Sequence, residues 1–395
     1  MLEYELKNED LLYFLHIPKT AGTSFFDFLE NQFEYHQIHP RLKDKHFIKE
    51  KRYNFSNSNL LRGHIGYGIY QSVSKNLIYV TMLRSPIDQV LSRYAQFTSP
   101  IYMDKHPDEL TRKIDLLDML NDEKQSRRFF NPQTRFIASD LDITTKRKNN
   151  LDGEERPTTM NILEMEVPEK NNKELLQTAK KRLEKFKFVG LTEYFKESIW
   201  LLCYTFGWKP TSKFPQVNLS KSRLKKENIS SELTEKILEN TKLDRDLYEF
   251  GKKIFENRYA TMIQELTNQY GINAGKSIHD LLEKKYYERT KFAPHSSIEY
   301  TFEKPLLGTG WHLREYLRST DTVFRWTGPS TESTIEFQLQ SQNNLKLEIT
   351  ILSKISEDAL SSLQIYFNEN KIEFEKKDNK ITGFIDSSWI EDRRF

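Results

Sequence analysis

Apolar residues in the first part of the chain alternate between short continuous runs and stretches with helical spacing. Residues 11–17 (LLYFLHI) form one run, which ends at a proline and predicts a buried parallel strand. In residues 24–33 the aromatic and leucine positions then recur at helical spacing. A second run, 77–83, leads through a short loop into another helical pattern that continues to about residue 97. Two strand–loop–helix units in succession predict an α/β fold, with a doubly wound parallel sheet and flanking helices.

The pattern changes to period two from about residue 298. Apolar and polar side chains alternate over 335–339 and over 345–351, and 363–367 faces 372–374 across a short turn. Alternation of this kind predicts antiparallel strands, and the short turn predicts a hairpin. Several such strands close together in sequence predict an all-β, sandwich-like module.

This change of period divides the chain of 395 residues into parts. We expect a first domain over 1–270, a connector over 271–296 and a β-sandwich-like accessory module over 297–395. A chain of this length has room for one large catalytic domain and a smaller module. In the module, Trp311 and Trp326 either fill the core or stack on a sugar ring, and the size of the module favours the core.

Composition excludes some classes of function. Sixty Lys and Arg residues against 57 Asp and Glu give a formal net charge of +3, which argues against a dedicated nucleic-acid binder. Cys203 is the only cysteine, so neither an intramolecular disulfide nor a thiolate metal site can form. The charged amino-terminal segment lacks the pattern of a signal peptide, and no stretch is long and apolar enough to span a membrane. We therefore expect a cytoplasmic protein without a membrane span, whose oligomeric state the composition leaves open.

The loop between the first predicted strand and its helix has the composition of an anion-binding loop. It reads PKTAGTS over 18–24, and its small residues let the backbone approach a phosphate while the helix start offers free N–H groups. Thr23 and Ser24 add hydroxyl donors, and Lys19 adds a positive charge. The lysine precedes the glycine, unlike the order in ATP-type phosphate loops, which disfavours a kinase or ATPase. The alternative is an ordinary strand-to-helix turn capped by a hydroxyl residue.

Residues 16–24 (HIPKTAGTS) resemble the 5′-phosphosulfate-binding loop of sulfotransferases that use 3′-phosphoadenosine 5′-phosphosulfate (PAPS). The likeness is strongest to the branch that contains the heparan sulfate 2-O-sulfotransferases and their bacterial relatives, and it extends over roughly 10–260. It implies a P-loop-like form of the doubly wound sheet, PAPS as donor and adenosine 3′,5′-bisphosphate (PAP) as product. By the same resemblance Lys19 contacts the oxygen that bridges phosphate and sulfate. The residues that hold the 5′-phosphate would be Thr20, Ala21, Gly22, Thr23 and Ser24.

A second element resembles the part of this family that binds the 3′-phosphate. Arg84 stands at the end of the second predicted strand, and Ser92 follows about two helical turns later. In the family an Arg and a Ser at these places bind the 3′-phosphate. The alternative is that Arg84 caps a surface and that Ser92 merely faces a neighbouring helix. Ser85 and Gln89 occupy places where the family often has an acid and a second Arg, which puts supporting salt bridges in doubt. Lys221 matches a loop that closes over the adenine and the 3′-phosphate, with a solvated lysine as the alternative.

Sulfuryl transfer to an alcohol needs a base for the acceptor proton and a cation for the leaving phosphate. His64, in a glycine-rich segment between the two nucleotide motifs, resembles the Gly-His of the family, whose His is the general base. His16 is the second candidate for the base. The alternative for His16 is a packed histidine that orients the loop. Lys19 would neutralise the bridging oxygen. No metal is required, and no spacing of His, Cys or carboxylates suggests a metal site.

The expected reaction is in-line transfer of the sulfuryl group from PAPS to a hydroxyl acceptor on a carbohydrate or glycolipid. Residues 131–135 (NPQTR) also resemble a family stretch near the acceptor, without an assigned role. Two other readings stay open. One is a nucleotide- or carbohydrate-binding protein without catalysis, and the other is a sulfotransferase acting on a peptide tyrosine or a small metabolite.

Overall fold

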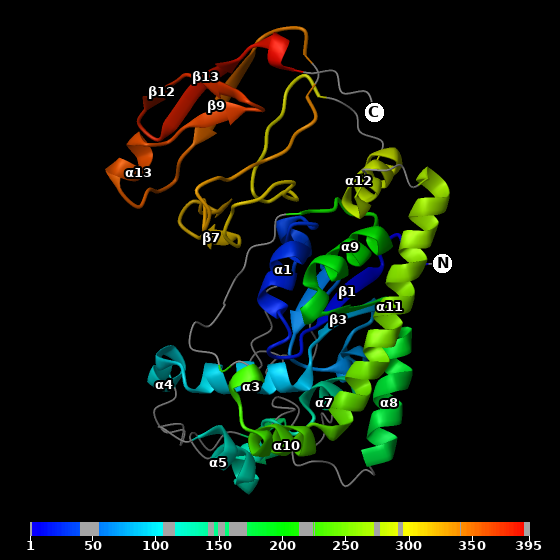
Figure 1. Ribbon diagram of the computed structural model, residues 1–395. Coiled ribbons are helices and arrows are strands. Elements are labelled where there is room, and N and C mark those ends of the chain that lie inside the picture. Colours follow the sequence, from blue (N-terminus) through cyan, green and yellow to red (C-terminus); the bar gives the residue numbers. More distant parts are fainter. Residues whose placement is uncertain are drawn as a thin grey trace. The chain divides into compact units, whose positions relative to one another are not determined.

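The computed structural model of this chain divides into two compact units, Met1–Tyr286 and Tyr287–Phe395. Figure 1 shows the helices and strands of both. The residues that the structure describes are 2–39, 55–105, 115–140, 146–148, 155–157, 172–212, 224, 226–271, 277–290, 295–339 and 341–390.

The first unit is built on a parallel sheet of four strands. In spatial order the strands are β2 (Leu60–Gly63), β1 (Asp10–Leu15), β3 (Asn76–Leu83) and β6 (Phe188–Leu191). Every residue of β1 is buried, as the continuous apolar run predicts for a strand covered on both faces. Leu15 pairs with Gly63 on one side and with Thr81 on the other, so the carboxyl ends of three strands lie at one edge.

Helices flank this sheet, and α9 and α11 both contact β6. Figure 1 shows α8 and α11 running side by side, where they pack against each other. Helix α11 is the longest of the described helices, and α10 precedes it. A small antiparallel pair is formed by β4 (Lys146–Lys148) and β5 (Glu155–Pro157). The helices are α1 (Gly22–Glu30), α3 (Pro86–Phe97), α4 (Pro100–Lys105), α5 (Leu116–Asn121), α6 (Glu123–Ser126), α7 (Pro132–Ala138), α8 (Asn172–Lys185), α9 (Phe195–Phe206), α10 (Ser231–Asn240), α11 (Lys242–Tyr270) and α12 (Ile278–Arg289).

Two apolar cores stabilise the unit. The larger one encloses the sheet, and its strand residues Leu11, Leu12 and Phe14 are fully buried. A second cluster lies under α3, α5 and α10 and includes Leu91 and Ile237. Each fully buried Leu or Phe side chain contributes about 1.5–3 kcal/mol. The prediction of an α/β fold with a parallel sheet and flanking helices is confirmed, while its P-loop-like, doubly wound form remains a prediction.

The second unit consists of antiparallel strands. Strands β9 (Leu345–Thr350), β13 (Lys380–Ile385) and β12 (Phe374–Lys377) form one sheet with β13 in the middle. The predicted hairpin is confirmed, since Ile365 pairs with Ile372 across the turn. The other elements are β7 (Glu315–Leu317), β8 (Thr322–Phe324), β10 (Ile365–Phe367), β11 (Asn370–Ile372) and α13 (Glu357–Ser361).

One predicted strand of this unit is wrong. The alternating residues 335–339 form no regular ladder, and Leu339 makes only an isolated bridge with His295. The preceding backbone instead lies against two glycines: a Cβ on Gly308 would come within 1.9 Å of the Thr334 carbonyl oxygen. Two backbone hydrogen bonds join this segment to 307–309 in place of a regular ladder, from the Thr334 N–H to the Thr309 carbonyl oxygen at 2.8 Å and from the Glu336 N–H to the Leu307 carbonyl oxygen at 2.7 Å. Antiparallel strands are thus present, and a sandwich remains a prediction.

Candidate functional site

The phosphate-binding loop predicted from sequence follows β1 and precedes α1. Lys19 and Ala21 both have left-handed backbone angles, with φ of 71° and 59°. The side chain of Thr20 is fully buried, and its hydroxyl donates to the carbonyl oxygen of Ile17 at 2.9 Å. That hydroxyl is therefore used within the loop, and the group that Thr20 can offer an anion is its backbone N–H. Helix α1 begins at Gly22, where the first-turn N–H groups have no intrahelical acceptors.

Two carbonyl groups of this loop are held by residues of the second predicted nucleotide motif. Arg84 donates from Nη1 to the carbonyl oxygen of Lys19 at 2.9 Å, and Gln89 donates from Nε2 to that of Pro18 at 2.9 Å. In a trans peptide the C=O and the next N–H point in opposite directions. The N–H groups of Lys19 and Thr20 therefore point away from Arg84 and Gln89. Gln89, which replaces the family's second Arg, fixes the loop instead of adding a charge.

His16 lies directly on the start of α1. A Cβ added to Gly22 would come within 1.8 Å of Nε2 of His16, so this position accepts only glycine while the ring stays in place. The ring also stacks on Phe14, with 5.1 Å between ring centroids. This packing favours His16 as a residue that orients the loop.

His64 follows β2 and lies beside His16. Its Nδ1 is 2.6 Å from the main-chain carbonyl oxygen of His16, and the two rings are 4.3 Å apart between centroids. Because a carbonyl oxygen can only accept a hydrogen bond, Nδ1 must carry a proton. In the neutral ring Nε2 then holds the lone pair, so it is the ring nitrogen that can accept a proton.

Buried tyrosines support the segment that carries His64. The hydroxyl of Tyr13 lies 3.4 Å from the carbonyl oxygen of Gly63 and 3.3 Å from that of Gly66, and it donates to this pair. Tyr79 donates to the carbonyl oxygen of Tyr67 at 2.7 Å. Burial raises the pKa of Tyr79 far above its usual value, so the hydroxyl remains a donor.

The backbone at Arg84 is bound by two side chains for which no role was predicted from sequence. The side-chain amide of Gln133 accepts from the Arg84 N–H at 3.0 Å and donates to the Arg84 carbonyl oxygen at 2.8 Å. Glu193 accepts from the N–H of Ser85 at 2.8 Å. Ser85 stands where the family often has an acid, and here Glu193 brings a carboxylate to that place. Gln133 belongs to the NPQTR stretch, whose resemblance was the only signal for it.

Asp244, in the first turn of α11, is fully buried at the start of α7. Its carboxylate accepts from the backbone N–H groups of Gln133 at 3.0 Å and Thr134 at 2.7 Å. Burial raises the pKa of Asp244 to about 6, although these hydrogen bonds and Arg135 favour the ionised form. Burial also lowers the pKa of Arg135 to about 10. In return, Oδ1 of Asn131 caps the first turn of α11, so the two helices cap each other.

The remaining predicted residues have different positions. Ser92 is half-buried on α3, three residues after Gln89 and so on the same face of the helix. Thr23 and Ser24 are half-buried in the first turn of α1. Lys221 lies outside the described residues.

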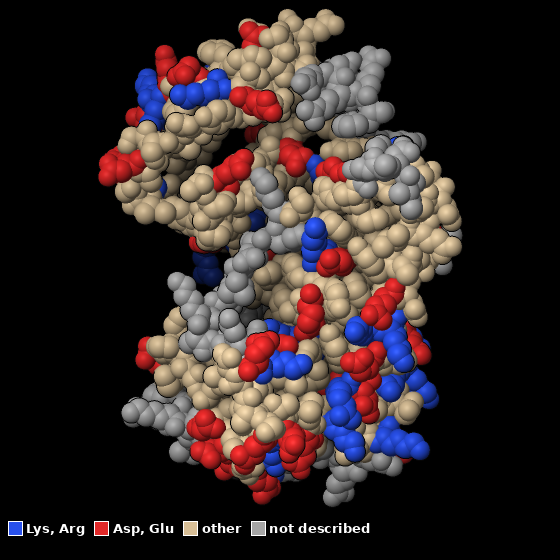
Figure 2. All heavy atoms as spheres, in the orientation of Figure 1, with Lys and Arg blue, Asp and Glu red and all other residues tan. Residues whose placement is uncertain are grey.

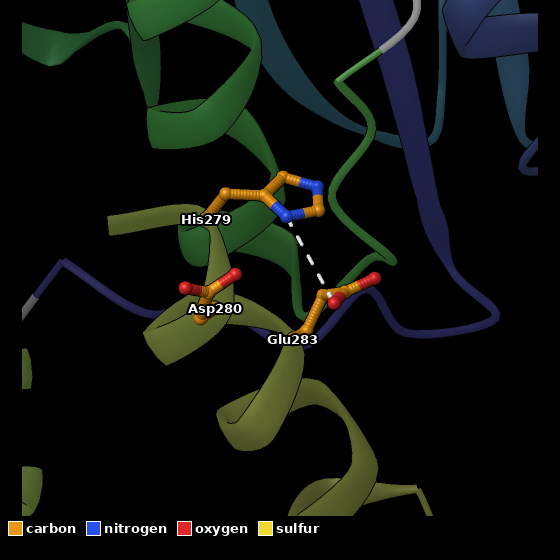
Figure 3. A group of neighbouring side chains, drawn as sticks. All are labelled: His279, Asp280 and Glu283. Atoms are coloured by element: carbon orange, nitrogen blue, oxygen red, sulfur yellow. Dashed lines mark ion pairs between the residues drawn. The ribbon is translucent and has the colours of Figure 1, made fainter. Parts of the chain in front are cut away.

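A cluster on α12 has the residue types of a metal site, and its possible ligand atoms lie within 4.8 Å of one another. Figure 3 shows His279, Asp280 and Glu283 together, with a distance of 3.8 Å between Nδ1 of His279 and Oε2 of Glu283. Asp280 accepts from the N–H of Ser277 at 2.8 Å and thus caps its own helix. Two ligand atoms that each lie about 2 Å from one ion are up to about 4 Å apart, so this spacing is compatible with a metal, and the expected absence of a metal site stays a prediction.

The face seen in Figure 2 carries charges of both signs. Basic side chains gather over α8 and the neighbouring part of α11, interleaved with acidic ones, and acidic side chains predominate over α5 and α10. A mixed surface of this kind agrees with the near-balanced charge of the chain.

Comparison with known proteins identified relatives, although no family model matches the chain. Human heparan-sulfate 6-O-sulfotransferase 3 is 26% identical over 300 residues, covering 65% of this chain and 60% of the relative. Human heparan-sulfate 6-O-sulfotransferase 2 is 25% identical over 296 residues, covering 67% of this chain and 47% of the relative. Heparan-sulfate 6-O-sulfotransferase 1-B from Danio rerio is 26% identical over 294 residues, covering 65% of this chain and 69% of the relative. The match thus spans less than two thirds of the human relatives, and the 2-O branch expected from sequence is not confirmed.

These relatives correct the predicted location. By name they act on heparan sulfate, a substrate that conflicts with a cytoplasmic protein, so that prediction is wrong. It rested on the absence of a leader and of an apolar span, and such absences do not define a compartment. Within the described residues, the structure has no helix with the length and apolarity needed to cross a bilayer.

The similarity and the motifs agree with each other. The relatives are carbohydrate sulfotransferases, and the two loops predicted from this family meet in the structure, where Arg84 binds the carbonyl of Lys19. The chain is therefore similar in sequence to sulfotransferases.

Proposed function

We propose that this chain transfers a sulfuryl group from PAPS to a hydroxyl group of a glycan, with His64 as the general base. The observation that carries the proposal is the hydrogen bond between Nδ1 of His64 and the His16 carbonyl oxygen, at 2.6 Å. It prepares Nε2 to take a proton, beside a loop suited to a phosphate. We assign the activity to residues 1–270, followed by a connector at 271–296 and an accessory module at 297–395.

The residues around the loop fit the donor. N–H groups at the start of α1, with the hydroxyls of Thr23 and Ser24, offer donors to a 5′-phosphate. Arg84 is a planar, permanently charged donor for the 3′-phosphate, and Ser92 offers a hydroxyl from the same side of α3. Lys221 is the matching residue for a loop over the adenine.

The protein's part in the reaction is to move one proton and to balance one charge. PAPS supplies the sulfuryl group: its bond from sulfur to the bridging oxygen breaks as the acceptor oxygen bonds to sulfur. His64 takes the acceptor's proton on Nε2. Lys19 neutralises the charge that develops on the bridging oxygen, which leaves with the electron pair as part of PAP.

The first test is a thermal-shift titration with PAP and with ADP, on wild type and on Arg84→Ala. Ligand at about a hundred times its dissociation constant stabilises the fold by ~2.7 kcal/mol, which is easily resolved. We expect a large shift with PAP, a small one with ADP, and loss of the PAP shift in Arg84→Ala. Absence of a PAP shift in wild type would overturn the proposal.

Transfer itself is tested with sulfur-labelled PAPS and heparan-type oligosaccharides, because the relatives are named for heparan sulfate. A glycolipid, a tyrosine peptide and small alcohols serve as alternative acceptors. If PAP binds but no acceptor is labelled, the second candidate function, a binding protein without catalysis, gains support over the enzyme.

A further inference from the structure

Two side chains on one face of α11 are connected by chains of hydrogen bonds to the backbone of Arg84 and Ser85. Asp244 and Tyr248 are four residues apart and therefore lie on the same side of the helix. Asp244 bonds to Gln133 and Tyr248 bonds to Glu193, and each of these two residues bonds to the loop after β3. Arg84 is thus held from two directions by one helix.

The first route passes through Gln133. Asp244 accepts from the Gln133 N–H at 3.0 Å, which fixes the first turn of α7. The Gln133 side chain then binds both the N–H and the carbonyl of Arg84, at 3.0 and 2.8 Å. Gln133 is 1% exposed and Asp244 is fully buried, so water cannot readily replace these contacts.

The second route passes through Glu193. Tyr248 donates to Oε2 of Glu193 at 3.1 Å, and Oε1 of Glu193 accepts from the Ser85 N–H at 2.8 Å. Burial raises the pKa of Tyr248 far above its usual value, so its hydroxyl stays a donor. Thr192, next to Glu193, also donates to the carbonyl oxygen of Leu83 at 3.1 Å. This bond holds the last residue of β3, directly before Arg84.

We propose that Gln133 and Glu193, held by Asp244 and Tyr248, are positioning residues that aim Arg84 at the 3′-phosphate of the nucleotide. With its backbone fixed on both sides, Arg84 keeps only side-chain freedom, and its Nη1 is bound to the Lys19 carbonyl. A guanidinium held in this way binds an anion without losing further conformational freedom. The inference rests on the proposed function, since it concerns the 3′-phosphate.

The test compares PAP with adenosine 5′-monophosphate (AMP), which differs only in lacking the 3′-phosphate. Dissociation constants of both are measured by calorimetry, with displacement of PAP where AMP binds weakly. In Glu193→Ala and in Gln133→Met we expect PAP to bind about tenfold more weakly, the loss of roughly one hydrogen bond to a charged group, with AMP changed less than about twofold. A purely structural role would weaken both ligands alike.

A conservative variant and a matched control complete the test. Glu193→Gln keeps an acceptor for the Ser85 N–H and offers an amide donor to the Tyr248 hydroxyl, so it should retain the wild-type ratio of PAP to AMP affinity. Tyr204→Phe removes a similar Tyr–Glu hydrogen bond, to Glu265 farther along α11, and should also leave the ratio unchanged.

Failure of this inference is distinct from failure of the proposed function. Circular dichroism first shows that Glu193→Ala and Gln133→Met are folded. If wild type binds PAP much more tightly than AMP and both variants keep that preference, the positioning role is wrong. If wild type shows no preference for PAP over AMP, the donor assignment itself is wrong.

Discussion

Nδ1 of His64 and the carbonyl oxygen of His16 are 2.6 Å apart, and this contact joins two loops that are distant in sequence. His16 follows β1 and His64 follows β2; these strands are parallel neighbours, with Leu15 opposite Gly63. Parallel pairing therefore brings the two histidines together at the same edge of the sheet. The carbonyl fixes the tautomer of His64, and the sheet fixes the carbonyl.

Replacing His64 should separate binding from chemistry. We expect His64→Ala to lower the transfer rate by about 10²–10⁴-fold, the usual contribution of a general base, and to change PAP affinity little. Single-turnover transfer from labelled PAPS measures the rate, and the thermal shift with PAP measures binding. His16→Ala is the comparison variant: a larger effect on PAP binding than on the transfer step would agree with its role in orienting the loop. A normal transfer rate in His64→Ala would remove His64 as the base.

Gly22 should tolerate no side chain while His16 keeps its position. A Cβ there would come within 1.8 Å of Nε2 of His16, so Gly22→Ala must displace the ring or the helix start. Overpacking of this kind costs about 1–3 kcal/mol in the free energy of unfolding, which urea denaturation measures.

The matched experiment places Gly22→Ala in the His16→Ala background. There the ring is absent, and the same substitution should cost less than half as much. Equal costs in both backgrounds would mean that the contact with His16 does not restrict Gly22.

The first strands and the position of the loop between strand and helix were predictable because their signals are local. The run 11–17 and the loop 18–24 are adjacent in sequence, and the spacing of 77–83 and Arg84 repeats the same unit. The segment 335–339 had the right alternation, but its backbone makes single hydrogen bonds, such as that from the Glu336 N–H to the Leu307 carbonyl oxygen at 2.7 Å, and an isolated bridge instead of a regular ladder. Period two predicts which side chains share a face, and it does not predict which backbone lies beside them.

The supports of Arg84 could not be predicted in this way. Gln133 is 49 residues from Arg84, and Glu193 is 108 residues from Ser85, so no local pattern links them. Asp244 in a first helical turn suggests only an interaction with the helix dipole, and its burial becomes visible once α7 packs against α11. Polar groups that act through tertiary hydrogen bonds leave no periodic signal in the sequence.

Asp244 should make the fold less stable as the pH rises. Its pKa is about 6 in the folded protein against an ordinary value of 3.8, because burial outweighs its hydrogen bonds and Arg135. Between these values the folded state binds more protons than the unfolded state, so stability present at low pH is lost as the pH rises through 6. Between pH 4.5 and 7.5 the loss from this group is about 2 kcal/mol.

Asp244→Asn isolates this contribution, since asparagine has a similar size and does not titrate. We expect the free energy of unfolding of wild type, relative to Asp244→Asn, to fall by about 2 kcal/mol from pH 4.5 to 7.5. Urea denaturation of both proteins at several pH values measures the difference, and other titrating groups cancel. A difference that increases with pH would mean that the folded pKa lies below 3.8 and that hydrogen bonding, not burial, dominates at Asp244.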